Sequence, residues 1–391
     1  MIAATPERDH QPDWPDGAAV RRARDALAGA APLVTAPDID RLRSRLAQPA
    51  FVLQAGDCAE TFRDNTPASV ADRVALLRAM AGEIAGGSGR PVVTVGRIAG
   101  QYAKPRSAPT ESRSGITLPS YLGDAVNGEH FSAARRIPDP RNLVHAHEHS
   151  RKTLSYLAGS GVFTSHEALL LDYERPQTRP ATAEGRFYDH SAHLLWIGER
   201  TRSLTGPHID FAAGIANPIA VKIGPTATPT VLTGLHAVLN PDNVPGRLAF
   251  IFRMGHRRAY DLLYAMLSRI TAEGWTDRVI CDPMHGNTVV SPAGVKTRVV
   301  TTVEAETRAF FGACNDTGVT PGGIHLEVSG EDVSECVATD IDDAYLATDY
   351  RSACDPRLNP GQASRLARLV GELLSPHRES TPLREMAMSG T

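Results

Sequence analysis

The chain has 391 residues, of which 42% are hydrophobic and 22% are charged, and its formal net charge at pH 7 is -3. This composition is that of a globular protein and excludes a disordered chain, and the charge gives no sign of a nucleic-acid-binding surface. No apolar run approaches the roughly 18 residues of a membrane span, and the start lacks the apolar core of a signal peptide, so we expect a cytoplasmic protein with no membrane partner.

Two helices are predicted ahead of the main domain. Apolar residues recur at three- and four-residue spacing over residues 18–30 and 39–46. We expect these helices to pack as a plug beneath the following domain or as an oligomer contact. Residues 1–50 are therefore predicted to be an N-terminal extension.

Eight short apolar runs follow, each closed by a polar or charged residue. They are FVLQAGDCAE at 51–60, PVVTVGRIAG at 91–100, LLLDYE at 169–174, HLLWIGERTR at 193–202, AVKIGP at 220–225, RLAFIFRMGH at 247–256, RVICDPMHGN at 278–287 and GIHLEVSGE at 323–331. Helix-length stretches lie between several of them, at 68–85, 151–157, 229–239, 258–272 and 301–313, and another closes the series at 361–374.

Strands that alternate with helices predict a parallel sheet, and eight such units predict a (β/α)8 TIM barrel. We place it at residues 51–375 and expect residues 376–391 to be a disordered tail. In this fold the active site is built where the strands end.

The strand ends carry a selected set of side chains. They are Cys58, Arg97, Glu199 with Arg200, Lys222, Arg253, His285 and Glu327. A thiol, an imidazole and a carboxylate are ligands for a divalent metal, and the cations suit a phosphorylated or carboxylated anion. The pattern therefore predicts a metal ion beside a basic anion pocket.

A second basic group follows Arg97. Lys104 and Arg106 come within ten positions of it, among glycine, serine and proline, and no acidic residue occurs from Gly96 to Pro109. Backbone amides and guanidinium groups in such a loop are suited to bind phosphate.

Lys222 stands inside an otherwise apolar strand. Burying an unpaired ammonium costs several kcal/mol, so we expect an anionic partner, either the substrate or Glu199.

Two other patterns argue against alternative metal sites. The histidines of HAHEHSRKT at 145–153 lie two residues apart, whereas helical zinc motifs use a spacing of four. The five cysteines form no CxxC pair, which is against a structural zinc knuckle, and their odd number is against a disulfide framework.

These motifs together resemble the type II 3-deoxy-D-arabino-heptulosonate 7-phosphate (DAHP) synthases. The resemblance runs from about Trp14 to Leu374, and CDPMHGNT at 281–288 and WIGERTR at 196–202 are its most specific segments; others are GRIAGQYAKPRS at 96–107 and ACDPRLN at 353–359. It implies a (β/α)8 barrel that condenses phosphoenolpyruvate with erythrose 4-phosphate, using a divalent metal, at the entry to the shikimate pathway.

The resemblance also implies roles for single residues. Cys58, His285, Glu327 and Asp355 would hold the metal, Arg97, Glu199, Arg200, Lys222 and Arg253 would surround phosphoenolpyruvate, and Lys104, Arg106 and Ser107 would face the aldose phosphate. Within that set, Lys222, Arg253 and Glu199 are the expected catalytic residues. We expect Mn2+, with Co2+, Fe2+ or Zn2+ as alternatives. The resemblance further implies a homo-oligomer, with chorismate mutase as a candidate partner.

Two departures from the family pattern bear on function. Leu122 stands where an arginine is usual, which keeps open an amino-substituted aldose phosphate as substrate, and a non-catalytic regulatory barrel is a further alternative. The chain ahead of Phe51 is shorter than in members that bind aromatic amino acids, which favours a role in secondary metabolism without feedback inhibition by those amino acids.

Cys354 precedes Asp355, so a disulfide between Cys354 and Cys58 is a candidate redox switch.

Overall fold

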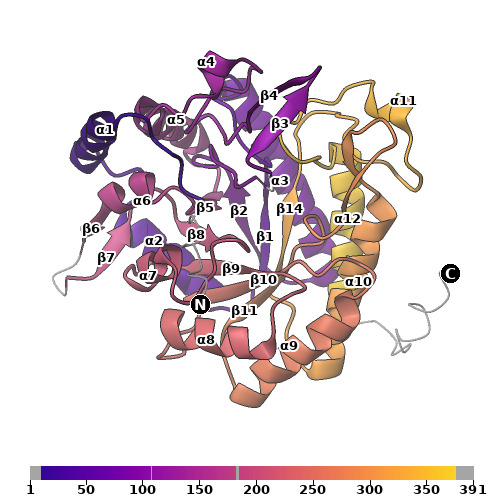
Figure 1. The fold of residues 1–391 in the computed structure, drawn as a ribbon. Helices are drawn as coiled ribbons and strands as arrows, with labels where there is room; N and C mark the ends of the chain where they lie inside the picture. Colours follow the sequence, from indigo (N-terminus) through magenta and orange to yellow (C-terminus); the bar gives the residue numbers. More distant parts are fainter. Residues whose placement is uncertain (1–9, 107, 182–184, 376–391) are drawn as a thin grey trace, which may run out of the picture.

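The computed structural model describes residues 10–106, 108–181 and 185–375 (Figure 1). Its centre is a closed barrel of eight parallel strands, in the order β1-β14-β11-β10-β9-β8-β5-β2. The predicted (β/α)8 barrel is confirmed. The strands are β1 (Phe51–Gly56), β2 (Val92–Arg97), β5 (Phe163–Glu167), β8 (Leu194–Ile197), β9 (Ile219–Ile223), β10 (Leu248–Phe252), β11 (Arg278–Cys281) and β14 (Gly323–Glu327).

The barrel closes between the first strand and the last. Gly56 of β1 is paired with Glu327 of β14 on one side and with Arg97 of β2 on the other. Because all eight strands are parallel, their carboxyl ends meet at one rim. The strand-end residues predicted to form the active site therefore lie at that rim.

The third predicted strand was placed wrongly. The strand is FTSHE at Phe163–Glu167, whereas residues 169–174 lie in a loop and in helix α6 (Leu171–Gln177). The sequence analysis missed this strand because its middle residues are polar. The three leucines 169–171 suggested a strand, but they pack into apolar clusters outside the barrel.

Helices surround the barrel, as expected for this fold (Figure 1). Besides α6 they are α3 (Pro67–Ser88), α4 (Ala133–Arg136), α5 (Arg141–Leu157), α7 (Pro207–Ala213), α8 (Pro229–Leu239), α9 (Ala259–Glu273), α10 (Val300–Thr317), α11 (Asp343–Leu346) and α12 (Pro360–Leu374). Helix α12 begins at a capping box of Asn359 and Gln362, and α10 ends where Gly318 adopts a φ of 73°.

Two helices precede the barrel, α1 (Gly17–Gly29) and α2 (Ala36–Leu46). Leu42 and Leu46 of α2 pack against barrel residues such as Val52, Ala249 and Ile280, so α2 plugs the barrel as expected. Helix α1 lies against α5 and α6. The proposed boundaries at residues 50 and 375 stay predictions, and the tail 376–391 lies outside the described residues.

Three hairpins decorate the loops that follow the strands. They are β3 (Thr110–Arg113) with β4 (Ile116–Pro119), β6 (Thr178–Pro180) with β7 (Phe187–Asp189), and β12 (Thr288–Val290) with β13 (Lys296–Arg298). No helix among the described residues is long and apolar enough to cross a membrane.

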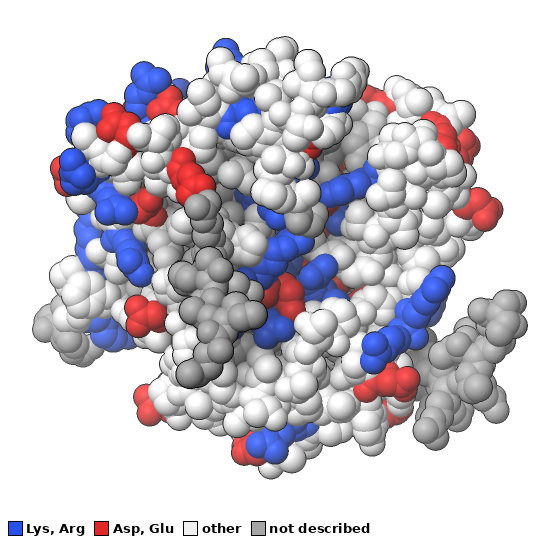
Figure 2. All heavy atoms as spheres, viewed as in Figure 1, with Lys and Arg blue, Asp and Glu red and all other residues white. Residues whose placement is uncertain are grey.

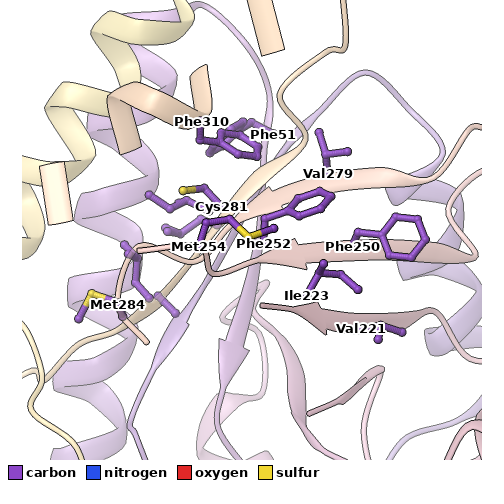
Figure 3. Packing of buried hydrophobic residues seen from close by; sticks show 14 of the residues in the cluster. Phe51, Val221, Ile223, Phe250, Phe252, Met254, Val279, Cys281, Met284 and Phe310 are labelled. Atoms are coloured by element: carbon purple, nitrogen blue, oxygen red, sulfur yellow. The ribbon is translucent and has the colours of Figure 1, made fainter. Parts of the chain in front are cut away.

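The apolar core lies mainly between barrel and helices, and Figure 3 shows part of it around β9, β10 and β11. Val221, Ile223, Phe250 and Phe252 all belong to this outer layer. Successive side chains of a strand point to opposite faces, so the residues between them must face the barrel interior. This alternation decides which side chains reach the active site.

Candidate active site

The alternation places one polar residue from almost every strand inside the barrel. On β9, Lys222 lies between the outward-facing Val221 and Ile223 and is only 5% exposed. The same rule turns Arg97 and Asp282 inward, because Val95 and Ile280, two residues before them, pack inside the barrel. Glu327 faces inward because its neighbours Leu326 and Val328 belong to the outer layer. Thus the polar ends of the strands converge because the apolar positions next to them pack outward.

Three of the predicted metal ligands form a tight cluster. The sulfur of Cys58 and one carboxylate oxygen each of Glu327 and Asp355 lie within 4.8 Å of one another. The fourth, His285, has its Nε2 2.9 Å from Oε1 of Glu327. The four come from the loops after β1 and β11, from the end of β14 and from the segment before α12.

This cluster already attracts a cation. The ammonium of Lys104 donates to Sγ of Cys58 at 2.6 Å, to Oε1 of Glu327 at 3.1 Å and to Oδ2 of Asp355 at 2.6 Å. The buried guanidinium of Arg298 pairs with the other oxygen of Glu327 at 2.7 Å. A thiol and two carboxylates that converge on one positive charge, with an imidazole beside Glu327, are a fitting donor set for a divalent transition metal.

The acidic ligands are held in their charged form. Burial pushes the pKa of Glu327 upward, but His285, Lys104 and Arg298 outweigh it and keep that pKa well below its usual value. Burial, followed by the neighbouring Cys354, raises the pKa of Cys58 well above that of a free thiol. Binding of a metal at Cys58 must therefore displace a proton.

Beside the cluster lies a cavity of about 300 Å³ lined by basic side chains. Figure 2 shows Lys and Arg side chains gathered with acidic ones in the hollow at the centre of one face of the molecule. Of the predicted residues, the cavity wall includes Arg97, Lys104, Arg106, Glu199, Arg200, Lys222 and Arg253 together with the ligands Cys58, His285 and Asp355. Glu327 is fully buried next to this cavity, and the other predicted site residues among those the structure describes all line it.

Arg97 ties the metal cluster to the basic wall. Its guanidinium donates to the carbonyl oxygens of Asp57 at 2.9 Å and Cys58 at 3.1 Å, and to Oε1 of Glu327 at 3.1 Å. It also lies over the ring of Trp196, 4.9 Å from the centroid. Its Nη1 also contacts Nε2 of His325 at 2.5 Å, so these bonds hold the guanidinium in one orientation in the cavity wall.

Lys222 has the anionic partner that its burial predicts, but this partner is Asp282 and not the alternative Glu199. The ammonium of Lys222 contacts Asp282, whose carboxylate also accepts from Nδ1 of His285 at 2.8 Å. Glu199 instead accepts from Arg202 at 2.7 Å and from the backbone amide of Gly224 at 2.6 Å. Sequence could not reveal Asp282 as the partner, because Lys222 lies on β9 and Asp282 follows β11, and β10 separates these two strands in the barrel.

Lys222 and Asp282 have opposite responses to burial. Burial lowers the pKa of Lys222 to about 8, despite the attraction of Asp282. Burial acts to raise the pKa of Asp282, but His285 and Lys222 outweigh it and keep that pKa well below the usual value. At neutral pH the lysine is therefore cationic and the aspartate anionic.

The second basic group lies at the edge of the cavity. Arg106 donates to the sulfur of Cys354 at 3.2 Å, close to the metal cluster. Ser107, predicted to face the aldose phosphate, lies outside the described residues.

Several residues of the cavity wall were not predicted. They are Gln101, Glu167, Trp196, Thr288, Val290 and Lys296. Glu167 ends β5, the strand that was predicted at residues 169–174 instead. Its Oε1 is buried without a hydrogen-bond partner, and burial raises its pKa. Gly198 makes room for it, since a Cβ there would lie 2.1 Å from that oxygen.

The histidine-rich segment 145–153 lies on α5, away from the cavity. His147 is buried and hydrogen-bonded to Gln177 at 2.9 Å, and His149 stacks on Phe62 with the ring centroids 4.4 Å apart. Neither belongs to a metal-ligand group among the described residues.

Buried carboxylates hold the loops that carry these residues. Glu60 accepts from the amides of Ala99, Gly100 and Gln101, in the loop between Arg97 and Lys104. Glu306 accepts from the amides of Met254 and Gly255, next to Arg253, at 2.7 and 3.0 Å. Charge-assisted hydrogen bonds of this kind are stronger than neutral ones and fix the loop backbone.

Comparison with known proteins shows the family of this chain. The sequence matches the class-II DAHP synthetase family over residues 4–161 and 155–371. The chain belongs to the class-II DAHP synthetase family. Membership confirms the resemblance, and with it the predicted enzyme class, a DAHP synthase of the transferase type in the shikimate route to aromatic compounds.

Two relatives within the class-II DAHP synthetases cover nearly the whole chain. A phospho-2-dehydro-3-deoxyheptonate aldolase of Streptomyces coelicolor is 40% identical over 426 aligned positions, which span 93% of this chain and 94% of the relative. The aldolase AroG of Mycolicibacterium smegmatis is 41% identical over 430 positions, spanning 93% and 92%. Both alignments are longer than the 391-residue chain, so both relatives contain segments that this chain lacks.

Proposed function

We propose that the protein joins phosphoenolpyruvate to erythrose 4-phosphate in a metal-dependent condensation that yields DAHP and phosphate. The observation that carries the proposal is the convergence of Cys58, Glu327 and Asp355 within 4.8 Å, beside a cavity lined by cations. A site for one metal and two phosphorylated substrates needs both features.

Cys58, His285, Glu327 and Asp355 would hold the ion. One soft and three harder ligands fit Mn2+, our first choice, and also Co2+, Fe2+ or Zn2+. A divalent ion bound there supplies Lewis acidity toward the aldehyde oxygen, where negative charge develops. Asp282 supports the imidazole of His285 from behind, which leaves Nε2 facing Glu327.

Arg97, Arg200, Lys222 and Arg253 would bind the phosphate and carboxylate of phosphoenolpyruvate. Arg253 is oriented by its bond to the carbonyl of His285 at 2.8 Å, and Lys222 by Asp282. Glu199, fixed by Arg202 and Gly224, would complete this wall. These residues contribute by positioning the substrate and by stabilising its charge, with Lys222, Arg253 and Glu199 as the catalytic members.

Lys104, Arg106 and Ser107 would face erythrose 4-phosphate. Lys104 touches three of the proposed ligands, so the aldose bound by it lies beside the metal cluster. Charge-assisted contacts from lysine and arginine are suited to its phosphate group.

The reaction forms a bond from C3 of phosphoenolpyruvate to the aldehyde carbon, while water adds at C2 and phosphate leaves. Water needs a base or an orienting acceptor near C2. Glu167 has a buried oxygen without a protein partner in the cavity wall. We assign Glu167 to orient that water.

Leu122 favours a second candidate, the condensation of an amino-substituted aldose phosphate. Leu122 packs beside the apolar cluster around Tyr102, and its carbonyl accepts from the amide of Lys104 at 2.9 Å. A neutral residue next to this backbone lowers the positive charge near the second substrate.

A homo-oligomer, an association with chorismate mutase and a role in secondary metabolism are supported by the family resemblance alone. The phosphorylated substrates and the five free cysteines support a cytoplasmic location. Sedimentation of the protein alone and mixed with chorismate mutase tests the two assemblies.

The deciding experiment is an assay of phosphoenolpyruvate consumption. We expect consumption to require erythrose 4-phosphate, to stop with a chelator and to return with Mn2+. A parallel assay with the amino-substituted aldose phosphate ranks the two candidate substrates by kcat/KM. The absence of consumption with either aldose, under every divalent ion tested, would favour the regulatory barrel.

A further inference from the structure

A buried carboxylate stands behind the segment that carries Asp355. Glu335 is fully buried and accepts from the backbone amides of Arg351 at 3.2 Å, Ser352 at 2.8 Å and Arg357 at 2.7 Å. It also accepts twice from the guanidinium of Arg357, at 3.0 and 2.7 Å. Every one of these donors flanks Asp355 in the chain.

The guanidinium of Arg357 continues to a second loop. Its Nη1 lies 2.7 Å from Oδ1 of Asp57, the residue before Cys58, and Nε of Arg73 holds the other oxygen of Asp57 at 2.8 Å. One guanidinium therefore joins the segment of Asp355 to the loop of Cys58. The two loops also meet directly, since the amide of Asp355 donates to Sγ of Cys58 at 3.1 Å.

Arg357 does not face the substrates. Asp57, Arg73 and Arg357 line a separate polar cavity of about 450 Å³, and none of the three lines the substrate cavity. Asp57 meets the wall of the substrate cavity through its backbone carbonyl, which accepts from Arg97. An effect of Arg357 on the metal site must therefore pass through the two loops.

We propose that Arg357, fixed by Glu335, is a positioning residue that sets the separation of Cys58 and Asp355 and thereby the affinity for the metal. This inference rests on the proposed metal site. A transition metal requires ligand atoms at about 2.0–2.3 Å, and a loop that must be ordered on binding weakens the site. Residues that orient metal ligands typically contribute about 10- to 100-fold to metal affinity.

The test is a titration of the metal-free protein with Mn2+, in which the free ion is measured directly. We expect the Kd of Arg357→Met to rise by about 10- to 100-fold. Arg351→Met is the matched control, because Arg351 belongs to the same segment but is bound to Glu331 and Asp349 at the surface. Its Kd should equal that of the wild type.

Thermal unfolding of the metal-free proteins shows whether a variant has lost folding stability as well as metal affinity. We expect Arg357→Lys, which can reach Asp57 or Glu335 but not both, to bind Mn2+ with intermediate affinity, and this variant decides if Arg357→Met does not fold. A wild-type Kd in both Arg357 variants would overturn the inference. If the wild type itself binds no divalent ion, the proposed metal site fails first, and the inference fails with it.

Discussion

The ammonium of Lys104 lies 2.6 Å from the sulfur of Cys58. Lys104 also pairs with Glu327 and Asp355, so it offsets part of the negative charge of the group that would hold the divalent ion. A lysine in this place competes with the metal for the same negative charge. In the proposed function it also binds the phosphate of erythrose 4-phosphate.

We therefore expect Lys104→Met to separate metal binding from catalysis. Removal of the competing cation should lower the Kd for Mn2+ by about tenfold, while kcat/KM for erythrose 4-phosphate falls by about 100-fold or more, as for other buried charge contacts. Metal titration and steady-state kinetics measure the two effects. Weaker metal binding in the variant would contradict this role.

The pH dependence should report Lys222. Since burial lowers its pKa to about 8, the ammonium loses its charge as the pH rises through that value, and binding of the anionic phosphoenolpyruvate weakens. We expect kcat/KM for phosphoenolpyruvate to fall by roughly tenfold per pH unit above that pKa. In Lys222→Arg the guanidinium stays charged, so this decline should disappear. A decline that persists in the arginine variant must come from another group.

Asp282 should matter both for the metal and for phosphoenolpyruvate. Asp282→Asn removes the charge that supports His285 and Lys222, and we expect metal affinity to fall by about 10- to 100-fold. Asp277→Asn is the control, because Asp277 is also a buried aspartate bound to a histidine, His236, at 2.6 Å. Equal metal affinity in the two variants would show that the partner of His285 is unimportant.

Glu167 should act in turnover more than in binding. Glu167→Gln keeps the shape of the side chain but removes its charge, and we expect kcat to fall by about 10²- to 10⁴-fold with little change in KM. Glu174→Gln is the comparison, since burial raises the pKa of Glu174 to about 8 and a neutral amide resembles its protonated form. If both variants retain wild-type kcat, the water must be oriented elsewhere.

Cys58 and Cys354 are suited to form a disulfide. The two buried cysteines pack together, and a hydrogen bond from Cys58 lowers the pKa of Cys354 to about 7. Hydrogen peroxide would take two electrons and two protons from the thiol pair and leave as two water molecules, and the disulfide sulfur of Cys58 could no longer bind metal. We expect the free thiol count to fall by two and activity to be lost until dithiothreitol is added. In Cys354→Ser this paired loss should not occur, and an unchanged thiol count in the oxidised wild type would contradict the switch.

The sequence predicted the barrel and the strand-end residues because an apolar run that stops at a charged residue is a local signal. Phe163–Glu167 gave no such signal, since its interior is polar, and Glu167 was not among the predicted site residues. Asp282 could have been found by counting two residues from the inward-facing Ile280, but only once the facing of the strand was known. Asp355 follows no strand, so only the family resemblance selected it.

Local sequence patterns could not predict which side chains pair with each other across the barrel. Glu199, which follows the strand before Lys222, was one candidate partner for it, but the partner is Asp282, which follows β11 further along the chain. Likewise, the five bonds from the segment of Asp355 to Glu335 depend on how a long loop folds back. The residue types at the strand ends can be read from short stretches of sequence, whereas the pairs that these residues form depend on how the barrel closes.

The closing of the barrel between β1 and β14 has a consequence for biosynthesis. Cys58 and Asp355 are separated by 297 positions, and their loops touch only when the first strand and the last are neighbours. A chain emerging from the ribosome exposes the Cys58 thiol long before the carboxylates that complete the site. Metal capture should therefore coincide with completion of translation, and a prematurely terminated product would carry the thiol without the means to retain an ion.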